Sequence, residues 1–227
     1  MTRLPRSTAP ELMDAPTADL ATLERTYARF GVVNSLVAGW RAAWRNVLRP
    51  RLSDGGRLLD VGTGGGDVPA MLSRWARADG IRLDIVGIDP DERAIAWARR
   101  HRTGLDLRLA HSSDLVAAGE RFDAVVSNHV LHHLDARSLG SLLADSEALA
   151  PDGIVLHSDL ERSRAARLAF GAGTALVHPF LFRGSFIRAD GLTSIARSHT
   201  APELAAAVPA GWRVERVAPW RLRLRRG

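Results

Sequence analysis

Short apolar runs and longer periodic segments alternate along most of the chain. The segments between the runs place apolar residues at the 3.6-residue period of a helix, beginning with Val68, Met71 and Leu72 after Asp67. Strands that alternate with helices predict an α/β domain built on a mostly parallel sheet. The five predicted strands are Arg57–Val61, Ile81–Ile88, Asp106–Ala110, Arg121–Ser127 and Ile154–Ser158. The first is the apolar run expected of a central strand that is buried on both faces.

The C-terminal part predicts a different strand arrangement. Trp212–Ala218 and Trp220–Arg225 are expected to close the sheet as an antiparallel pair. In the second segment, Leu222 and Leu224 alternate with arginines. This alternation is typical of a half-exposed edge strand.

The N-terminal part is predicted to lie outside the sheet. Residues 1–17 are polar and rich in Thr, Pro and Ser, which indicates a disordered lead. Two helices are expected next, Ala18–Phe30 and Val32–Leu48, separated by Gly31. Residues 18–49 would therefore form a helical cover, and residues 50–227 the main domain.

Two interpretations of the helical cover remain open. Its second helix has an apolar face, so it can pack on the main domain with a solvated basic rim. The cover can also serve as a lid over a substrate pocket. In that case Tyr27, Arg41 or Trp44 would contact the ligand.

A glycine cluster follows the first predicted strand. Gly62, Gly64 and Gly66 allow the backbone to turn tightly and to approach a ligand closely. A dinucleotide fingerprint would place pyrophosphate at the helix N-terminus, but Asp67 occupies that position. The carboxylates of Asp60 and Asp67 disfavour a phosphate and favour a ligand with a cationic centre.

This D-x-G-x-G-x-G stretch resembles motif I of the class I methyltransferases that use S-adenosylmethionine, and the similarity extends from about Leu58 onward. The resemblance implies a Rossmann-like, seven-stranded, mostly parallel sheet whose last strand is antiparallel. It also implies S-adenosylmethionine as cofactor. The implied cofactor-binding residues are Asp60, Gly62, Thr63, Gly64, Gly66, Asp89, Pro90, Ser113, Asp114, Asn128 and His129. Asp89, at the end of the second strand, would accept hydrogen bonds from the ribose.

The run from Phe122 to Leu134 contains Leu-His-His-Leu and looks like a segment of many small-molecule methyltransferases. It lacks the N-P-P-Y-type segment that amino-directed methyltransferases use. Strand ends in this fold border the ligand, so four side chains are candidates for the base that takes a proton from the acceptor. They are His132, His133, His157 and Asp159.

Residues 161–198 lie where class I enzymes commonly insert elements that shape the substrate pocket. The aromatic-rich part carries His178 and Phe182, which we expect in the pocket wall. Local core packing is an equally good interpretation of this segment.

Composition narrows the chemistry further. The chain of 227 residues has no cysteine, which excludes disulfides, thiolate metal sites and a cysteine nucleophile. No metal site is predicted. All 31 basic residues are arginine, and the net charge of +6 is moderate because 25 acidic residues are interspersed. No apolar run is long enough to span a bilayer, so a cytoplasmic monomer or homodimer is expected.

The predicted function is methylation of a small molecule. The favoured reaction is O-methylation of a phenolic, quinol or polyketide-like acceptor in bacterial secondary metabolism. A methyltransferase acting on RNA is an alternative favoured only by the excess of basic over acidic residues. Nucleic acid is therefore the less expected partner. A nucleotide-binding oxidoreductase is a further alternative, opposed by Asp67 and by the glycine spacing.

Overall fold

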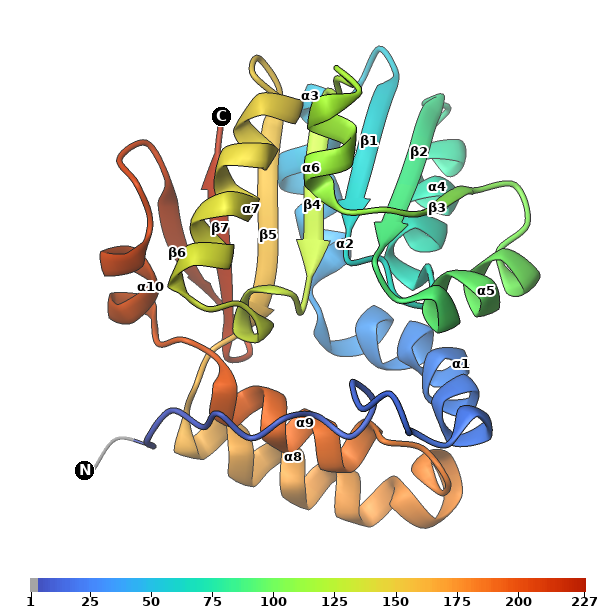
Figure 1. Ribbon diagram of the computed structural model, residues 1–227, viewed down its shortest axis with the longest axis vertical. Helices are drawn as coiled ribbons and strands as arrows, with labels where there is room; N and C mark the ends of the chain where they lie inside the picture. Colours follow the sequence, from blue (N-terminus) through green and yellow to red (C-terminus); the bar gives the residue numbers. More distant parts are fainter. Residues whose placement is uncertain (1–3) are drawn as a thin grey trace.

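The computed structural model describes residues 4–227, without the side chains of residues 36, 37, 178 and 179. Its sheet has seven strands in the order β3-β2-β1-β4-β5-β7-β6 (Figure 1). Strand β7 alone runs in the direction opposite to the other six strands. The predicted Rossmann-like methyltransferase sheet is thereby confirmed. The strands are β1 Gly56–Val61, β2 Leu83–Asp89, β3 Asp106–Leu109, β4 Ala124–Asn128, β5 Ile154–Leu160, β6 Arg213–Val217 and β7 Arg221–Arg226.

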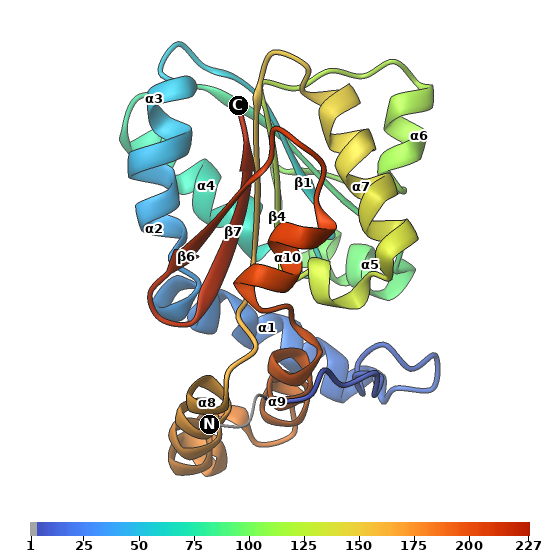
Figure 2. The same ribbon diagram turned by 90° about the vertical axis from the view of Figure 1, so that its left-hand side faces the viewer.

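Helices cover both faces of the sheet (Figure 2). One face packs against α2 (Trp40–Ala43), the π-helical η1 (Trp44–Leu48), α3 (Arg49–Arg51) and α4 (Asp67–Ala78). The other packs against α6 (Ser112–Ala117), α7 (Ala136–Leu149) and α10 (Ala201–Ala207). Each face has its own apolar core, because successive residues of a strand point to opposite sides. Leu58 belongs to the first core and Leu59 to the second.

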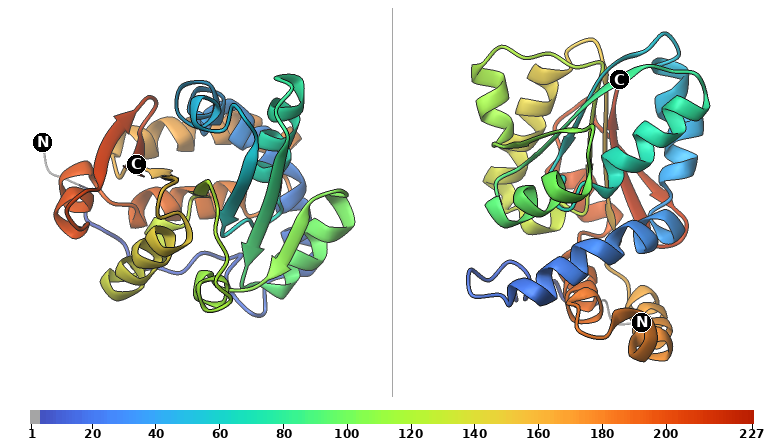
Figure 3. Two further views of the ribbon diagram at one scale, coloured as in Figure 1. Left: turned by 90° about the horizontal axis from the view of Figure 1, so that it is seen from above. Right: turned by 90° about the vertical axis from the view of Figure 1, so that its right-hand side faces the viewer.

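A further layer lies beyond the carboxyl ends of the parallel strands (Figures 1 and 3). It consists of α1 (Leu20–Val37), α8 (Arg164–Val177), η3 (His178–Phe182) and α9 (Ile187–Arg197). Helix α1 also packs on α5 (Glu92–His101), through Leu23, Tyr27 and Trp97. The predicted insertion thus forms part of a layer over the strand ends, where ligands bind in doubly wound sheets.

The helical cover divides at a different glycine from the one predicted. Helix α1 continues through Gly31 to Val37, and the chain turns at Gly39, whose φ is 69°. Gly31 faces α4: a Cβ there would lie 3.7 Å from the Cβ of Asp67. That separation is ordinary van der Waals contact, so Gly31 lies within α1 without breaking it, while the left-handed Gly39 ends the helix.

The second half of the cover is part of the sheet domain. Trp44 is fully buried in the first core, and its Nε1 donates to Asp79 Oδ2 at 2.8 Å. Arg41 is exposed, with its guanidinium 5.2 Å from the ring centroid of Trp75. The predictions that Arg41 and Trp44 contact substrate are wrong, because the apolar stripe of this helix packs on the sheet face.

The predicted disordered lead is wrong for residues 4–17. Residues 4–19, here called the N-terminal segment, run along α9 (Figure 1). Asp190 accepts hydrogen bonds from the backbone N–H groups of Leu12 and Met13, at 2.7 and 3.0 Å. From α5, Arg93 donates to the carbonyl oxygens of Met13 and Ala15. The backbone hydrogen bonds of this polar stretch are made with side chains that are distant in sequence. Local composition does not reveal such partners.

Strand β7 is an interior strand, and β6 forms the edge. Arg221 and Arg223 are buried, 2% and 7% exposed, so the arginine face of β7 is not solvated. Arg223 Nη2 donates to the carbonyl oxygen of Gly39 at 2.9 Å. The predicted half-exposed edge strand is wrong because protein groups, not water, receive these guanidinium hydrogen bonds.

Replacing Trp44 tests its structural role. Trp44→Ala removes a large buried side chain and should lower the free energy of unfolding by about 3–5 kcal/mol. Arg41→Ala, on the exposed side of the same segment, should cost less than about 1 kcal/mol. Urea denaturation followed by circular dichroism measures both. Equal costs for the two variants would contradict the assignment of Trp44 to the core.

Candidate active site

The glycine loop between β1 and α4 has an open side. Gly62, Gly64 and Gly66 all have positive φ, at 70°, 51° and 67°. No heavy atom lies within 4 Å of a Cβ built on Gly64. Asp89, at the end of β2, fixes the loop by accepting a hydrogen bond from the Gly64 N–H at 2.8 Å. The backbone here can come close to a ligand.

Two buried polar atoms at the end of β1 lack a hydrogen-bond partner among the described residues. They are Asp60 Oδ1 and Thr63 Oγ1. Burial raises the pKa of Asp60 well above its ordinary value. Buried polar atoms are rarely left unpaired, so these two fit the polar groups of a ligand seated on the glycine loop. The residues present therefore suit S-adenosylmethionine, whose ammonium group is a hydrogen-bond donor.

The predicted adenosine-binding residues lie at the carboxyl ends of β2 and β3. Asp89 is half-buried, and burial raises its pKa. Pro90, Ser113 and Asp114 are exposed. Pro90 directly follows Asp89, and the other two begin α6, which follows β3, the neighbour of β2 in the sheet. Asp114 also accepts the backbone N–H of His111 at 2.8 Å, so it caps α6. The structure brings these four residues to the same edge of the sheet, and their binding of adenosine stays a prediction.

Arg221 organises the end of β4. Its guanidinium donates to Asn128 Oδ1 and His129 Nε2, both at 2.8 Å. Because a guanidinium only donates, His129 Nε2 must be the acceptor and the ring proton lies on Nδ1. Burial, and secondly the charge of Arg221, lower the pKa of His129 well below its ordinary value. Sequence reasoning missed Arg221, which it placed on an exposed strand face.

His129 to His133, here called the histidine loop, follows β4 and contains the short 3-10 helix η2 (Leu131–His133). It packs directly on the glycine loop: a Cβ on Gly62 would lie 2.5 Å from Val130 Cγ2. His129 adopts a positive φ of 62°, which is uncommon for a residue other than glycine. The histidine loop therefore borders the region that the glycine loop leaves open.

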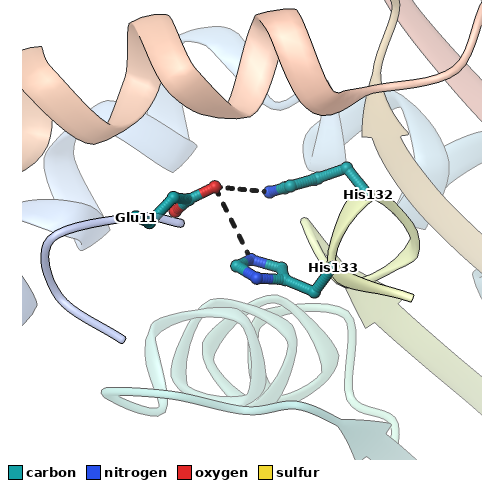
Figure 4. A group of neighbouring side chains, drawn as sticks. All are labelled: Glu11, His132 and His133. Carbon is teal, nitrogen blue, oxygen red and sulfur yellow. Dashed lines mark hydrogen bonds and ion pairs between the residues drawn. The ribbon is translucent and has the colours of Figure 1, made fainter. Parts of the chain in front are cut away.

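His132 is held between two carboxylates. Asp159, at the end of β5, accepts from the His132 backbone N–H at 2.9 Å and lies 2.8 Å from His132 Nδ1. On the other side of the ring, His132 Nε2 lies 3.0 Å from Oε1 of Glu11 (Figure 4). Burial opposes protonation, but the two carboxylates outweigh it and raise the pKa of His132 to about 9.

His133 lies against the same glutamate (Figure 4). Its Nε2 is 3.8 Å from Glu11 Oε1, and its Nδ1 is 3.2 Å from Asp14 Oδ2. Ser194 of α9 also donates to Glu11 Oε1, at 2.8 Å. Sequence reasoning missed Glu11, Asp14 and Ser194. They carry no local signal, because they lie in a polar lead and in an insertion without clean periodicity.

The structure separates His157 from the other candidate bases. Its ring is fully buried, 2.8 Å from Ser127 Oγ and 3.3 Å from Ser146 Oγ, and it stacks on Trp212. Burial lowers its pKa to about 4. The prediction that His157 borders the acceptor is wrong, because its side chain packs between β4, α7 and Trp212. His132, His133 and Asp159 do come together.

Of the three remaining candidates for substrate binding, the structure describes the side chains of Tyr27 and Phe182. Tyr27 is buried over the glycine loop, and a Cβ on Gly65 would lie 3.1 Å from its Cβ. Burial raises the pKa of its hydroxyl. Phe182 is half-buried in η3. The side chain of His178 lies outside what the structure describes.

Comparisons with known proteins assign the chain to a family that agrees with this fold. A family model for a methyltransferase domain covers residues 38–199. The chain belongs to the class I S-adenosylmethionine-dependent methyltransferases. A ubiquinone biosynthesis O-methyltransferase of Cereibacter sphaeroides is 35% identical over an alignment of 162 positions, which covers 67% of this chain and 63% of that protein. A protein with the same name from Dinoroseobacter shibae is 32% identical over 66% of this chain and 62% of its own length. The chain thus matches somewhat less than two thirds of these relatives.

Solved structures share the fold at low identity. An O-methyltransferase family protein from Burkholderia thailandensis has a TM-score of 0.63 and 17% identity, over 94% of this chain and 60% of that one. A plantazolicin methyltransferase, crystallised with a triazolic substrate analogue and SAH, has a TM-score of 0.59 and 11% identity, over 94% and 92% of the two chains. These similarities support the same arrangement of sheet and helices.

Asp89 provides a direct test of the cofactor site. Asp89→Asn removes the charge that accepts the Gly64 and Asp91 N–H groups. Hydrogen bonds to charged groups contribute about 1.5–3 kcal/mol, so affinity for S-adenosylhomocysteine should fall about tenfold or more in calorimetry. Asp84→Asn, on the exposed face of the same strand, is the matched control and should bind normally. An unchanged affinity of the Asp89 variant would remove this residue from the cofactor site.

The raised pKa of His132 predicts how stability depends on pH. A group whose pKa rises on folding stabilises the native state fully below its unfolded pKa, near 6.5, and loses this contribution as the pH approaches 9. The melting temperature of the unchanged protein should therefore fall between pH 6.5 and 9 by more than that of His132→Gln. Parallel curves for the two proteins in thermal denaturation would contradict the ion-paired state of His132.

Proposed function

We propose that the chain methylates a hydroxyl group of a small aromatic acceptor of the phenol or quinol type. The observation that carries this proposal is the contact between the glycine loop and the histidine loop, through Gly62 and Val130. It sets a cluster of proton-handling side chains beside the expected cofactor position. Bound S-adenosylmethionine would supply the methyl group, which the acceptor oxygen takes as the carbon–sulfur bond breaks with its electron pair on sulfur.

An O-methylation requires the acceptor hydroxyl to lose its proton. His132, His133, Glu11 and Asp159 are the groups of this site that can take up or direct that proton. The layer of α1, α9 and the N-terminal segment lies over the strand ends (Figure 3). Such a cover supports exclusion of bulk water and positioning of the acceptor.

The relatives favour an acceptor of the quinol class. Those from Cereibacter and Dinoroseobacter are named for ubiquinone biosynthesis. Their names give no support to the prediction of a role in secondary metabolism. For this chain we propose the chemical class of acceptor alone, a hydroxyl on an aromatic ring.

An RNA substrate has less support. That alternative requires arginines that are free to contact phosphates. Several arginines instead pair with carboxylates of their own chain, as Arg57 does with Glu120 and Arg108 with Asp106. In the part of the chain that the structure describes, no helix has the length and apolar character needed to cross a bilayer. The cytoplasmic location and the oligomeric state remain predictions.

His132→Gln tests the proposed function. The variant should bind S-adenosylhomocysteine normally, because His132 touches neither Asp89 nor Asp60 in the structure. Its turnover on catechol and hydroquinone acceptors should fall by about 10²–10⁴, the usual contribution of a group that handles the acceptor proton. Methyl transfer from labelled cofactor measures the rate.

The matched control is His101→Ala, an exposed histidine of α5, which should keep full turnover. If His132→Gln methylates phenols as fast as the unchanged protein, the histidine loop has no role in the reaction. If neither protein methylates any hydroxyl but both methylate an amine or a carbon acid, the proposed acceptor class is wrong.

A further inference from the structure

Three side chains from two separate parts of the chain direct nitrogen or oxygen atoms toward one another (Figure 4). One ligand atom from each of Glu11, His132 and His133 lies within 4.8 Å of the other two. Glu11 Oε1 is 3.0 Å from His132 Nε2 and 3.8 Å from His133 Nε2. Glu11 comes from the N-terminal segment, and the two histidines are neighbours in the histidine loop. Glu11 and His132 are almost completely buried, with side chains 4% and 1% exposed.

The groups behind these atoms orient them. Asp159 Oδ1 lies 2.8 Å from His132 Nδ1, and Asp14 Oδ2 lies 3.2 Å from His133 Nδ1. A carboxylate on Nδ1 keeps a proton on that nitrogen, so Nε2 is the nitrogen that can bind a cation. This carboxylate–histidine pairing is typical of histidines that bind metal ions. Ser194 fixes the third donor by hydrogen bonding to Glu11 Oε1.

We propose that Glu11, His132 and His133 bind one divalent cation of the zinc class. A tetrahedral zinc ion with bonds of about 2.0–2.1 Å holds its ligand atoms roughly 3.3 Å apart. The two distances from Glu11 Oε1, 3.0 and 3.8 Å, lie on either side of this separation. Two imidazoles and one carboxylate suit zinc and its neighbours in the first transition row, whereas magnesium and calcium prefer oxygen donors.

The charges also favour a cation. Three carboxylates, those of Glu11, Asp14 and Asp159, contact two imidazole rings. A proton on His132 accounts for the contacts of that ring alone. It does not explain why His133 turns its Nε2 towards the same oxygen while Asp14 holds its Nδ1. One divalent cation at the centre interacts with all three donors at once.

This inference rests on the proposed function and deepens it. Three protein ligands leave a tetrahedral cation one open position. The histidine loop packs on the glycine loop, so an acceptor oxygen in that position would lie on the cofactor side. A bound divalent cation lowers the pKa of a hydroxyl that it coordinates. The cluster would then select acceptors that bind as phenolates.

Calorimetric titration of the chelator-treated full chain with zinc chloride tests the site. We expect one ion per chain. Loss of an orienting partner typically costs 10–100-fold in metal affinity. Asp14→Asn should therefore weaken binding about tenfold, and loss of a ligand in Glu11→Gln or His133→Ala about a hundredfold or more. His101→Ala should bind as the unchanged chain does. Circular dichroism and binding of S-adenosylhomocysteine establish that each variant is folded.

A spectroscopic probe provides a second, independent readout. Cobalt in place of zinc should give the visible absorption of a tetrahedral site, and Glu11→Gln should lose it.

The inference is overturned if the folded variants and the unchanged chain bind zinc alike, or if cobalt gives no absorption of a tetrahedral site. The cluster would then be a hydrogen-bonded imidazolium, and the ion an adventitious one. The proposed function can fail separately. Zinc binding without methylation of any hydroxyl would reject the function and keep the site, whereas methylation unaffected by chelation, with no specific zinc binding, would reject the site alone.

Discussion

The carboxylate of Asp159 is the constraint on which the candidate site depends. It is buried at the end of β5, where an uncompensated charge would be very costly. It is compensated by the backbone and ring nitrogens of His132 and by the backbone N–H of Leu160. Burial alone would raise the pKa of Asp159, but the contact with His132 holds it well below its ordinary value. The charge thus fixes the conformation of the histidine loop.

From His132 the same network reaches the N-terminal segment and α9. Glu11 approaches the far side of the His132 ring, and Ser194 donates to Glu11. Asp190, one helical turn before Ser194, holds the backbone of Leu12 and Met13. Removing any one partner would leave a buried polar group unpaired, which costs more than the hydrogen bond itself contributes. The cover over the strand ends is therefore tied to the chemistry beneath it.

Much of the architecture could be predicted from the sequence because its signals are local. The apolar runs gave the five parallel strands, and the glycine cluster with Asp89 gave the cofactor side of the site. The acceptor side could not be predicted in the same way. Glu11 belongs to a stretch whose composition indicates disorder, and the partners that order it, in the histidine loop, α5 and α9, are all distant in sequence. The alternation of leucine and arginine in β7 resembled an exposed face because nothing in it shows that Asn128 and Gly39 receive the guanidinium groups.

Asp67 shows how one residue can satisfy a sequence argument for a different structural reason. Its carboxylate stands at the start of α4, where a pyrophosphate would otherwise bind, and it is buried there. Asn34 of α1 donates to it at 2.8 Å, and burial raises its pKa. The group that disfavours a phosphate also attaches α1 to the sheet domain. Since α1 carries Tyr27 over Gly65 as well, two contacts fix the position of α1 relative to the glycine loop, one through Asp67 and one through Gly65.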